Sequence, residues 1–333
     1  MIKKQVCGAL LALALAACAP SQADAPIAEQ WRAINVTATP VELGAERVGA
    51  LRFRGGVELR STEATFGGLS GLEVLDDGRF VALSDNGQWF EGRIVLDSAG
   101  ALTGVADVRT ALMRDERGEP FESKQAGDSE DLAQLPDGRF AVSFEQTQTI
   151  RIYDLNRDGP FGAAAPGPRL EGVRRLPPNV GLEALASTGG DALLVGAEGG
   201  SADRTPVWVA PLDARTPVPP QMTYPLARGF ALTSLDRLPG GGFVALERFY
   251  APVIGARARL TRFDDAALTQ RGGTIAKTEL ALLAPPMAVD NFEGVSAVRT
   301  ADGATRLYIV SDNNFSGRQR TLLYAFDVVE GGG

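Results

Sequence analysis

Two stretches of equal length decide the fold: Leu69-Ser-Gly-Leu-Glu-Val-Leu-Asp-Asp-Gly-Arg-Phe-Val-Ala-Leu-Ser-Asp85 and Ser129-Glu-Asp-Leu-Ala-Gln-Leu-Pro-Asp-Gly-Arg-Phe-Ala-Val-Ser-Phe-Glu145. Each contains a short apolar strand, a turn, a second apolar strand and a final acidic residue. The Asp-Gly pair at the turn supplies the positive φ that a tight hairpin needs. Because both stretches share Asp-Gly-Arg-Phe, we interpret them as copies of one internal repeat.

Three further segments fit the same pattern, at Gly181–Glu198, Ser234–Glu247 and Asn291–Asp312. A third strand is expected after each hairpin, and a fourth can be placed before the next copy, for example at Thr278–Leu283. The third strands are predicted at Arg93–Leu96, Ile150–Leu155, Val207–Leu212, Leu260–Phe263 and Leu322–Val328. Four strands per repeat are typical of a β-propeller blade. The sequence therefore predicts an all-β fold, a single β-propeller of four-stranded blades.

The number of blades is left open between five and six. Five copies are visible, and the strand-like segment Ala50–Leu59 precedes the first of them. We expect this N-terminal strand to complete the last blade and close the ring. A sixth, degenerate blade within Ile34–Ser61 is the alternative. In either case each blade needs its neighbours to cover its apolar faces, so residues 31–333 are expected to form one domain.

The N-terminus has the pattern of an export signal. Lys3 and Lys4 precede the apolar run Ala9–Ala17, which is too short to span a bilayer. The run ends in Leu15-Ala-Ala-Cys18, which resembles a lipobox. We predict a signal peptide at 1–17 and a flexible tether at 18–30, with lipid on Cys18 as the membrane anchor. The alternative is ordinary secretion with cleavage after Ala25.

The residue after Cys18 is Ala19, and not the Asp that signals retention in the inner membrane. We therefore expect an exported protein that is anchored in the outer membrane and faces the periplasm. Cys7 lies in the signal peptide, so the mature chain has no pair of cysteines for a disulfide.

Composition excludes several classes of function. The chain has no histidine, which excludes Ser-His-Asp and Cys-His hydrolases and every His-ligated zinc site. Without Lys3 and Lys4 it carries 31 basic and 41 acidic residues and no Lys/Arg run, so we expect no nucleic-acid partner. Any chemistry on a small-molecule substrate must use carboxylates, Tyr, Ser, Lys, Arg or a hard metal ion.

Acidic residues recur at two positions of the repeat. Since the first strand of a blade begins where the second ends, we expect both positions to lie at one mouth of the central channel. The first set is Glu73, Glu130 or Asp131, Glu183, Asp236 and Glu293, and the second set is Asp85, Glu145, Glu198, Glu247 and Asp312. Asn86, Asn291, Asn313 and Asn314 add neutral oxygen atoms.

Such a ring of carboxylates must be compensated by protons, arginines or a bound cation. Oxygen ligands of this kind suit calcium, and we predict a Ca²⁺ site here. Within it, we expect Glu73, Asp85, Glu293 and Asp312 to hold the metal, with Asn86 and Asn313 as neutral ligands. The alternative is structural pairing of the acids with arginines such as Arg248 and Arg318, which are also the candidate contacts for an anion.

These motifs resemble the phytase-like family, also called "esterase-like activity of phytase". The resemblance is carried by Gly68-Leu-Ser-Gly-Leu-Glu73, Ser84-Asp-Asn86, Ser129-Glu-Asp131, Gly181-Leu-Glu183, Asn291-Phe-Glu-Gly294 and Ser311-Asp-Asn-Asn-Phe315. It covers roughly residues 50–328 and implies a six-bladed propeller with calcium-dependent hydrolase activity. Sugar-lactone hydrolases of the propeller class resemble this layout too. Phytate-hydrolysing propellers have a strongly basic rim, whereas Lys124 and Lys277 are the only lysines of the mature chain.

A second, incomplete motif is Asp154-Leu-Asn-Arg-Asp-Gly159, which matches the first half of a calcium loop. Its twelfth position is Ala165 instead of Glu, so we interpret it as a solvated turn.

Two function classes remain. One is a metal-dependent hydrolase of phosphoesters, esters or lactones, with Glu73 or Glu293 as the base. The other is a non-catalytic module that binds a ligand or a protein.

Overall fold

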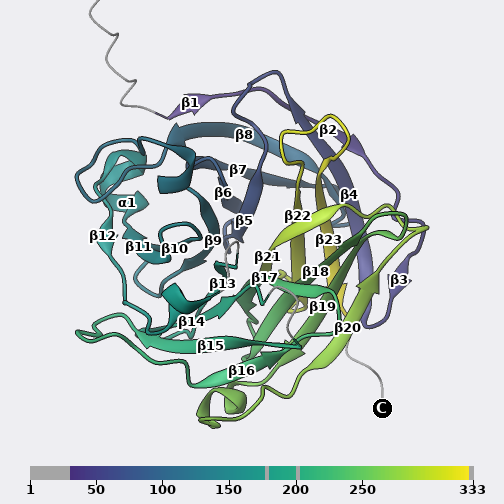
Figure 1. Ribbon diagram of the computed structural model, residues 1–333. Coiled ribbons are helices and arrows are strands. Elements are labelled where there is room, and N and C mark those ends of the chain that lie inside the picture. Colours follow the sequence, from purple (N-terminus) through teal and green to yellow (C-terminus); the bar gives the residue numbers. More distant parts are fainter. Residues whose placement is uncertain (1–30, 177–179, 200–202, 330–333) are drawn as a thin grey trace, which may run out of the picture.

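Five antiparallel sheets surround a central axis in the computed structural model, which describes residues 31–176, 180–199 and 203–329 (Figure 1). The strands nearest the axis are β5 (Leu69–Val74), β9 (Ser129–Gln134), β13 (Leu182–Ser187), β17 (Phe230–Arg237) and β21 (Asn291–Arg299). Each inner strand contacts the next, and β21 contacts β5, so the ring is closed. The predicted all-β propeller is confirmed.

The blades follow the predicted order along the chain. Blade 1 continues through β6 (Arg79–Ser84), β7 (Gln88–Leu96) and β8 (Leu102–Leu112), with β1 (Arg32–Ala33) at its edge. Blade 2 adds β10 (Phe140–Phe144), β11 (Thr149–Tyr153) and β12 (Ala165–Pro166), and blade 3 adds β14 (Ala192–Ala197), β15 (Arg204–Pro211) and β16 (Met222–Pro225). Blade 4 adds β18 (Phe243–Ala251), β19 (Gly255–Phe263) and β20 (Thr278–Leu283).

Blade 5 combines the two ends of the described chain. Its strands β22 (Thr305–Asp312) and β23 (Thr321–Val328) are followed in the sheet by β4 (Leu51–Ser61), which pairs with β23. This confirms the predicted closure by Ala50–Leu59, and Figure 1 shows purple β4 beside yellow β23.

A sixth blade within Ile34–Ser61 is not formed. The strands β2 (Val36–Pro40) and β3 (Arg47–Val48) both pair with β4 and extend blade 5 outward. The six-blade count that the family resemblance implies is therefore wrong for the described residues, which form five sheets. The physical reason is that β4 fills the free edge of β23, and the strands before it then have only the outer edge of β4 to pair with.

The hydrophobic core lies between neighbouring blades. Phe80 and Phe140, from the two Asp-Gly-Arg-Phe turns, are both buried. One cluster packs Val244 and Leu246 of blade 4 against Phe292 and Val295 of blade 5. Because each blade buries its faces on its neighbours, the ring forms one unit. Among the described residues no helix is long and apolar enough to cross a membrane.

Every inner strand has an irregularity at the same place. Its pairing with the second strand of the blade shifts register once, so that one extra residue bulges out of the ladder. By this register the five equivalent residues are Ser70, Glu130, Glu183, Thr233 and Glu293. A β-bulge redirects a side chain and often lies beside a functional site. Here it places three glutamates at equivalent positions around the axis.

Candidate functional site

One mouth of the channel carries a ring of acids, which we call the acidic mouth. Its inner members are the bulge residues Glu130, Glu183 and Glu293. Three outer members follow the second strands of blades 1 to 3: Asp85, Glu145 and Glu198. Their backbone N–H groups donate to the carbonyl oxygens of the residues just before β5, β9 and β13, so they lie at this end of the channel. Asp312 pairs with Asn291 at the start of β21, and Asp128 immediately precedes β9.

Two cations lie within this ring. The Lys124 ammonium contacts Asp85 at 2.8 Å and Asp128 at 2.9 Å. The Arg248 guanidinium contacts Glu198 at 2.9 Å and Glu293 at 3.3 Å. Arg248 therefore pairs with acids, as the structural alternative predicted for it. With eight carboxyl groups (Asp85, Asp128, Glu130, Glu145, Glu183, Glu198, Glu293 and Asp312) and two cations, the acidic mouth remains strongly negative.

The donor set suits a hard metal ion. Oxygen atoms of Asp128, Glu130 and Glu145 all lie within 4.8 Å of one another. Close by, Asp85 Oδ1 is buried and has no hydrogen-bond partner. A buried oxygen without a partner is costly unless a cation or proton reaches it. The residues of the acidic mouth thus fit a calcium ion, which takes several carboxylate oxygens.

The pKa shifts report the same lack of positive charge. Burial raises the pKa of Glu130 well above its usual range, and repulsion from Glu183 and Glu293 adds to this. Burial raises the pKa of Glu293 as well, against the opposing effect of Arg248. Burial and the nearby Glu293 raise the pKa of Asp312 to about 8. A cation bound among these carboxyl groups would favour their charged forms and lower these pKa values.

Glu73 and Asp236 do not belong to the acidic mouth, and this part of the prediction is wrong. Both lie near the other end of their inner strands, where they line a cavity at the opposite mouth. The error arose because Gly71-Leu72-Glu73 and Gly181-Leu182-Glu183 have the same sequence. Their positions along the inner strands of blades 1 and 3 differ by three residues. The residue of blade 1 that is equivalent to Glu183 is Ser70.

Asp131 is a structural residue and is fully buried. Its Oδ2 accepts hydrogen bonds from the backbone N–H groups of Leu185 at 2.9 Å and Leu235 at 3.2 Å, and Oδ1 accepts from Leu132. Burial raises the pKa of Asp131, and these three amides oppose the shift. The side chain thus connects β9 to β13 and β17 across the channel, and its oxygens are already used. It is not the free ligand that the sequence suggested.

Glu247 is also misplaced in the prediction. It is fully buried inside blade 4, where it accepts a 2.7 Å hydrogen bond from the Tyr224 hydroxyl and forms ion pairs with Lys277 and Arg259. At the position of Asp85 and Asp312 in the other blades, blade 4 has Arg248. The two residues are adjacent in sequence, and alternation along β18 puts only one of them at the channel.

Of the predicted neutral ligands, Asn291 lies within the acidic mouth: its Nδ2 donates to Glu293 Oε1 at 2.6 Å, and its Oδ1 accepts from Arg248 at 3.0 Å. The others and the second arginine lie in turns and loops beside the mouth. Asn86 is exposed in the turn between β6 and β7, and Asn314 and Arg318 are exposed in the loop after β22. Asn313 Oδ1 accepts hydrogen bonds from the backbone N–H groups of Gly68 and Phe315, so it fixes that loop. These contacts give Asn313 a positioning role beside the mouth.

The segment Asp154–Gly159 forms one helical turn, α1 (Leu155–Asp158). The Asp154 side chain caps it by accepting a hydrogen bond from the Arg157 backbone N–H at 3.0 Å. The interpretation as a turn after the strand agrees with this structure.

Sequence reasoning missed Asp128. In two other blades the equivalent residue is glycine, Gly68 or Gly181, so the repeat gives no signal at this position. Asp128 directly precedes the motif Ser129-Glu-Asp131, so extending that motif by one residue toward the N-terminus would have included it among the predicted acids. Cys18 lies outside the described residues.

One family of known proteins matches most of the chain. The family model "Phytase-like: Esterase-like activity of phytase" matches residues 64–315, well over half of the 333-residue chain. The chain belongs to this phytase-like family. All eight acids of the acidic mouth fall inside the part of this phytase-like chain that matches. No curated protein matches the chain.

Solved structures similar to the phytase-like chain include enzymes of sugar metabolism. A putative gluconolactonase is 15% identical, with a TM-score of 0.44, over 89% of this chain and 92% of its own. A gluconolactonase from Xanthomonas campestris is 12% identical, with a TM-score of 0.41, over 89% and 87%. A Trichoderma reesei enzyme of carbohydrate-active family AA12, in a calcium structure, is 12% identical, with a TM-score of 0.40, over 92% and 99%. Similarity at this level says nothing about the activity of this chain.

Proposed function

We propose that the protein is a calcium-dependent hydrolase that acts at the acidic mouth on an ester or lactone. The observation that carries the proposal is the excess of carboxylates there, with Asp128, Glu130 and Glu145 close enough to share one ion. Asp85 would be a further ligand, since its Oδ1 has no partner. Membership of a family described by esterase-like activity supports the reaction class.

Residues of the chain would supply the metal-binding, base and orienting roles. A bound calcium ion would supply Lewis-acid polarisation of the substrate oxygen. Glu293 is the candidate general base, because it is an inner member of the acidic mouth and is not one of the three acids that can share an ion. Arg248 contacts Glu293 and orients it. This assigns the base role to Glu293 and removes Glu73, which lies at the other mouth.

The charge of the mouth narrows the substrate class. Eight carboxyl groups face only Lys124 and Arg248, so a polyanion such as phytate would be repelled. A neutral ester or lactone suffers no such repulsion. We therefore infer that the substrate is uncharged near the scissile bond. A screen in which no phosphoester, ester or lactone is turned over in calcium would favour a non-catalytic binding module instead.

Calcium and pH should act together on stability. Because the folded-state pKa of Asp312 is raised to about 8, ionisation costs stability as the pH rises from its unfolded value through 8. In chelator we expect the melting temperature to fall as the pH rises from about 4 to 8, and to change little above pH 8. Calcium should remove this fall, and at 100-fold excess over its Kd it adds about 2.7 kcal/mol. Melting curves that are identical in calcium and chelator at pH 8 would contradict the metal site.

The anchoring proposal can be tested separately. The pattern around Cys18 supports lipidation and placement in the outer membrane, facing the periplasm. We expect Cys18→Ser to leave the protein unprocessed or to release it from the membrane fraction, while Cys7→Ser changes neither. Processed Cys18→Ser protein that still sediments with membranes would rule out the lipid anchor.

A further inference from the structure

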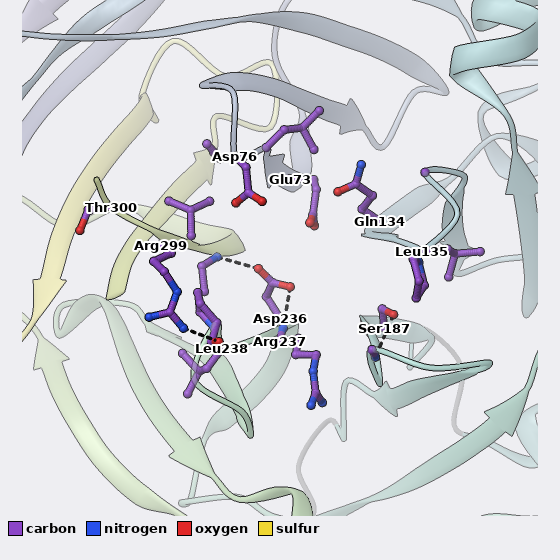
Figure 2. Close-up of a pocket in the computed structure, with 18 of the residues that line it drawn as sticks. Glu73, Asp76, Gln134, Leu135, Ser187, Asp236, Arg237, Leu238, Arg299 and Thr300 are labelled. Carbon is purple, nitrogen blue, oxygen red and sulfur yellow. Dashed lines mark hydrogen bonds between the residues drawn. The ribbon is translucent and has the colours of Figure 1, made fainter. Parts of the chain in front are cut away.

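A cavity of about 860 Å³ lies at the mouth of the channel opposite to the acidic mouth. It is located where the inner strands end and turn into the second strands of their blades. All five blades contribute lining residues, among them Glu73, Gln134, Ser187, Asp236 and Thr300 (Figure 2). Nothing in the proposed hydrolase function uses this cavity.

Two acids in the cavity are not required by the repeat. Glu73 of blade 1 and Asp236 of blade 4 occupy the same register position, opposite Val81 and Val244. The equivalent residues in the other three blades are Ala133, Ala186 and Ser296, as their pairings show. Small residues therefore satisfy the fold at this position and leave space, and two blades place carboxyl groups in that space.

These carboxyl groups have no cationic partner in the described part of the chain. The ion pairs found there include none to Glu73 or Asp236, although two arginines line the cavity. Arg237 instead pairs with Asp265 at 2.8 Å, and Arg299 donates to the Pro239 carbonyl at 2.6 Å. Burial, followed by repulsion from Asp236, raises the pKa of Glu73 well above its usual range.

Asp236 is held rigidly in this position. Its Oδ1 accepts a 2.6 Å hydrogen bond from the Arg237 backbone N–H, and Oδ2 accepts one of 2.6 Å from Ala297 of blade 5. Figure 2 shows Glu73, Asp76 and Asp236 directing their carboxyl groups toward the same open space. The cavity thus presents two neighbouring carboxyl groups to whatever enters it, and one of them is fixed in place.

Apolar side chains form one part of the remaining lining. Leu75, Leu135 and Leu238 line the cavity together with Pro136 and Pro239, at the turns of blades 1, 2 and 4. A metal ion would find few free oxygen ligands here, because both Asp236 oxygens already accept backbone hydrogen bonds. An ammonium group needs only one or two carboxylates, and carbon atoms attached to it can contact the leucines.

We propose that this cavity binds a small organic cation, with its ammonium group between Glu73 and Asp236 and its apolar part against Leu75, Leu135 and Leu238. This second site is independent of the hydrolase proposal. It differs in chemistry from the acidic mouth, which offers more carboxylates and has cations of its own.

The test compares benzylamine with benzyl alcohol, its neutral analogue of similar shape, by calorimetric titration of the full-length protein at pH 8. We expect benzylamine to bind at least about tenfold more tightly, which corresponds to 1.4 kcal/mol. Glu73→Gln keeps the side-chain shape and should abolish this preference. Asp213→Asn removes an exposed carboxylate outside both mouths and should leave the preference unchanged.

Three results would overturn the proposal. The first is a lack of benzylamine binding by the wild type, and the second is equal affinity for amine and alcohol. The third is that calcium displaces benzylamine from the wild type but not from Glu73→Gln, since that would make the cavity a metal site. Glu130→Gln at the acidic mouth should not alter benzylamine affinity, so failure here remains distinct from failure of the hydrolase proposal.

Discussion

Replacing Asp131 by alanine is expected to destabilise the propeller by about 4 kcal/mol. The change leaves the backbone N–H groups of Leu132, Leu185 and Leu235 without their acceptor in the buried channel. Each buried donor that loses its partner costs roughly 1–3 kcal/mol. The loss also disconnects three blades at once. The midpoint of urea unfolding, with its slope, measures the effect.

Two further variants show whether the hydrogen bonds of Asp131 are the cause. Asp131→Asn retains one acceptor oxygen and should lose about half as much stability, which keeps the test usable if the alanine variant does not fold. Asp137→Ala removes an exposed aspartate that pairs with Arg139 in the turn of the same hairpin, and should cost less than about 1 kcal/mol. Equal losses for Asp131→Ala and Asp137→Ala would show that the bridge across the channel contributes nothing.

Glu130→Gln is expected to lower turnover of the best ester or lactone substrate about a hundredfold, or about 3 kcal/mol in transition-state stabilisation. Glu130 is the inner member of the group whose oxygens lie within 4.8 Å of one another. The calcium affinity of the Glu130→Gln variant should fall in parallel. Because burial, and then the acidic neighbours, raise the pKa of Glu130, removing its charge should not destabilise the protein in chelator. Steady-state rates at matched calcium saturation measure the change.

Glu247→Gln is the matched control, since Glu247 is also a buried glutamate of the repeat. It pairs with Lys277 and Arg259 inside blade 4 and lies away from the acidic mouth. We therefore expect it to lower the melting temperature while leaving the rate per folded molecule unchanged. Wild-type turnover by Glu130→Gln would exclude Glu130 from the site. A similar loss of turnover in both variants would point to a general effect on folding.

The blades and the ring closure could be predicted because they depend on local signals. Asp77-Gly78 and Asp137-Gly138 fix two hairpins, and the alternation of apolar residues fixes the strands beside them. The strand Leu51–Ser61 was predictable because it precedes the first complete repeat while the last blade lacks a strand. These features reflect backbone geometry that a few residues determine.

The membership of the site was only partly predictable. Glu130, Glu183 and Glu293 were found, but the bulge that aligns them has no signature in the sequence. The Gly-Leu-Glu segments of blades 1 and 3 are offset by three residues relative to this bulge, so Glu73 and Glu183 lie near opposite ends of the channel although their sequences look equivalent. Whether a carboxylate is free, as at Asp85, or already hydrogen-bonded, as at Asp131, depends on contacts between blades.

The closure of blade 5 also determines when the molecule can become complete during its biosynthesis. β4 is made before its partner β23, and the four other blades lie between them in the sequence, although Thr321 pairs with Leu59. Pairing between such distant segments is slow, because a long loop must close first. Until then β4 is an exposed edge strand, open to pairing with other chains. We therefore expect the pairing of β4 with β23 to be the step that completes the ring, and the edge of β4 to be the place most open to misassembly before that step.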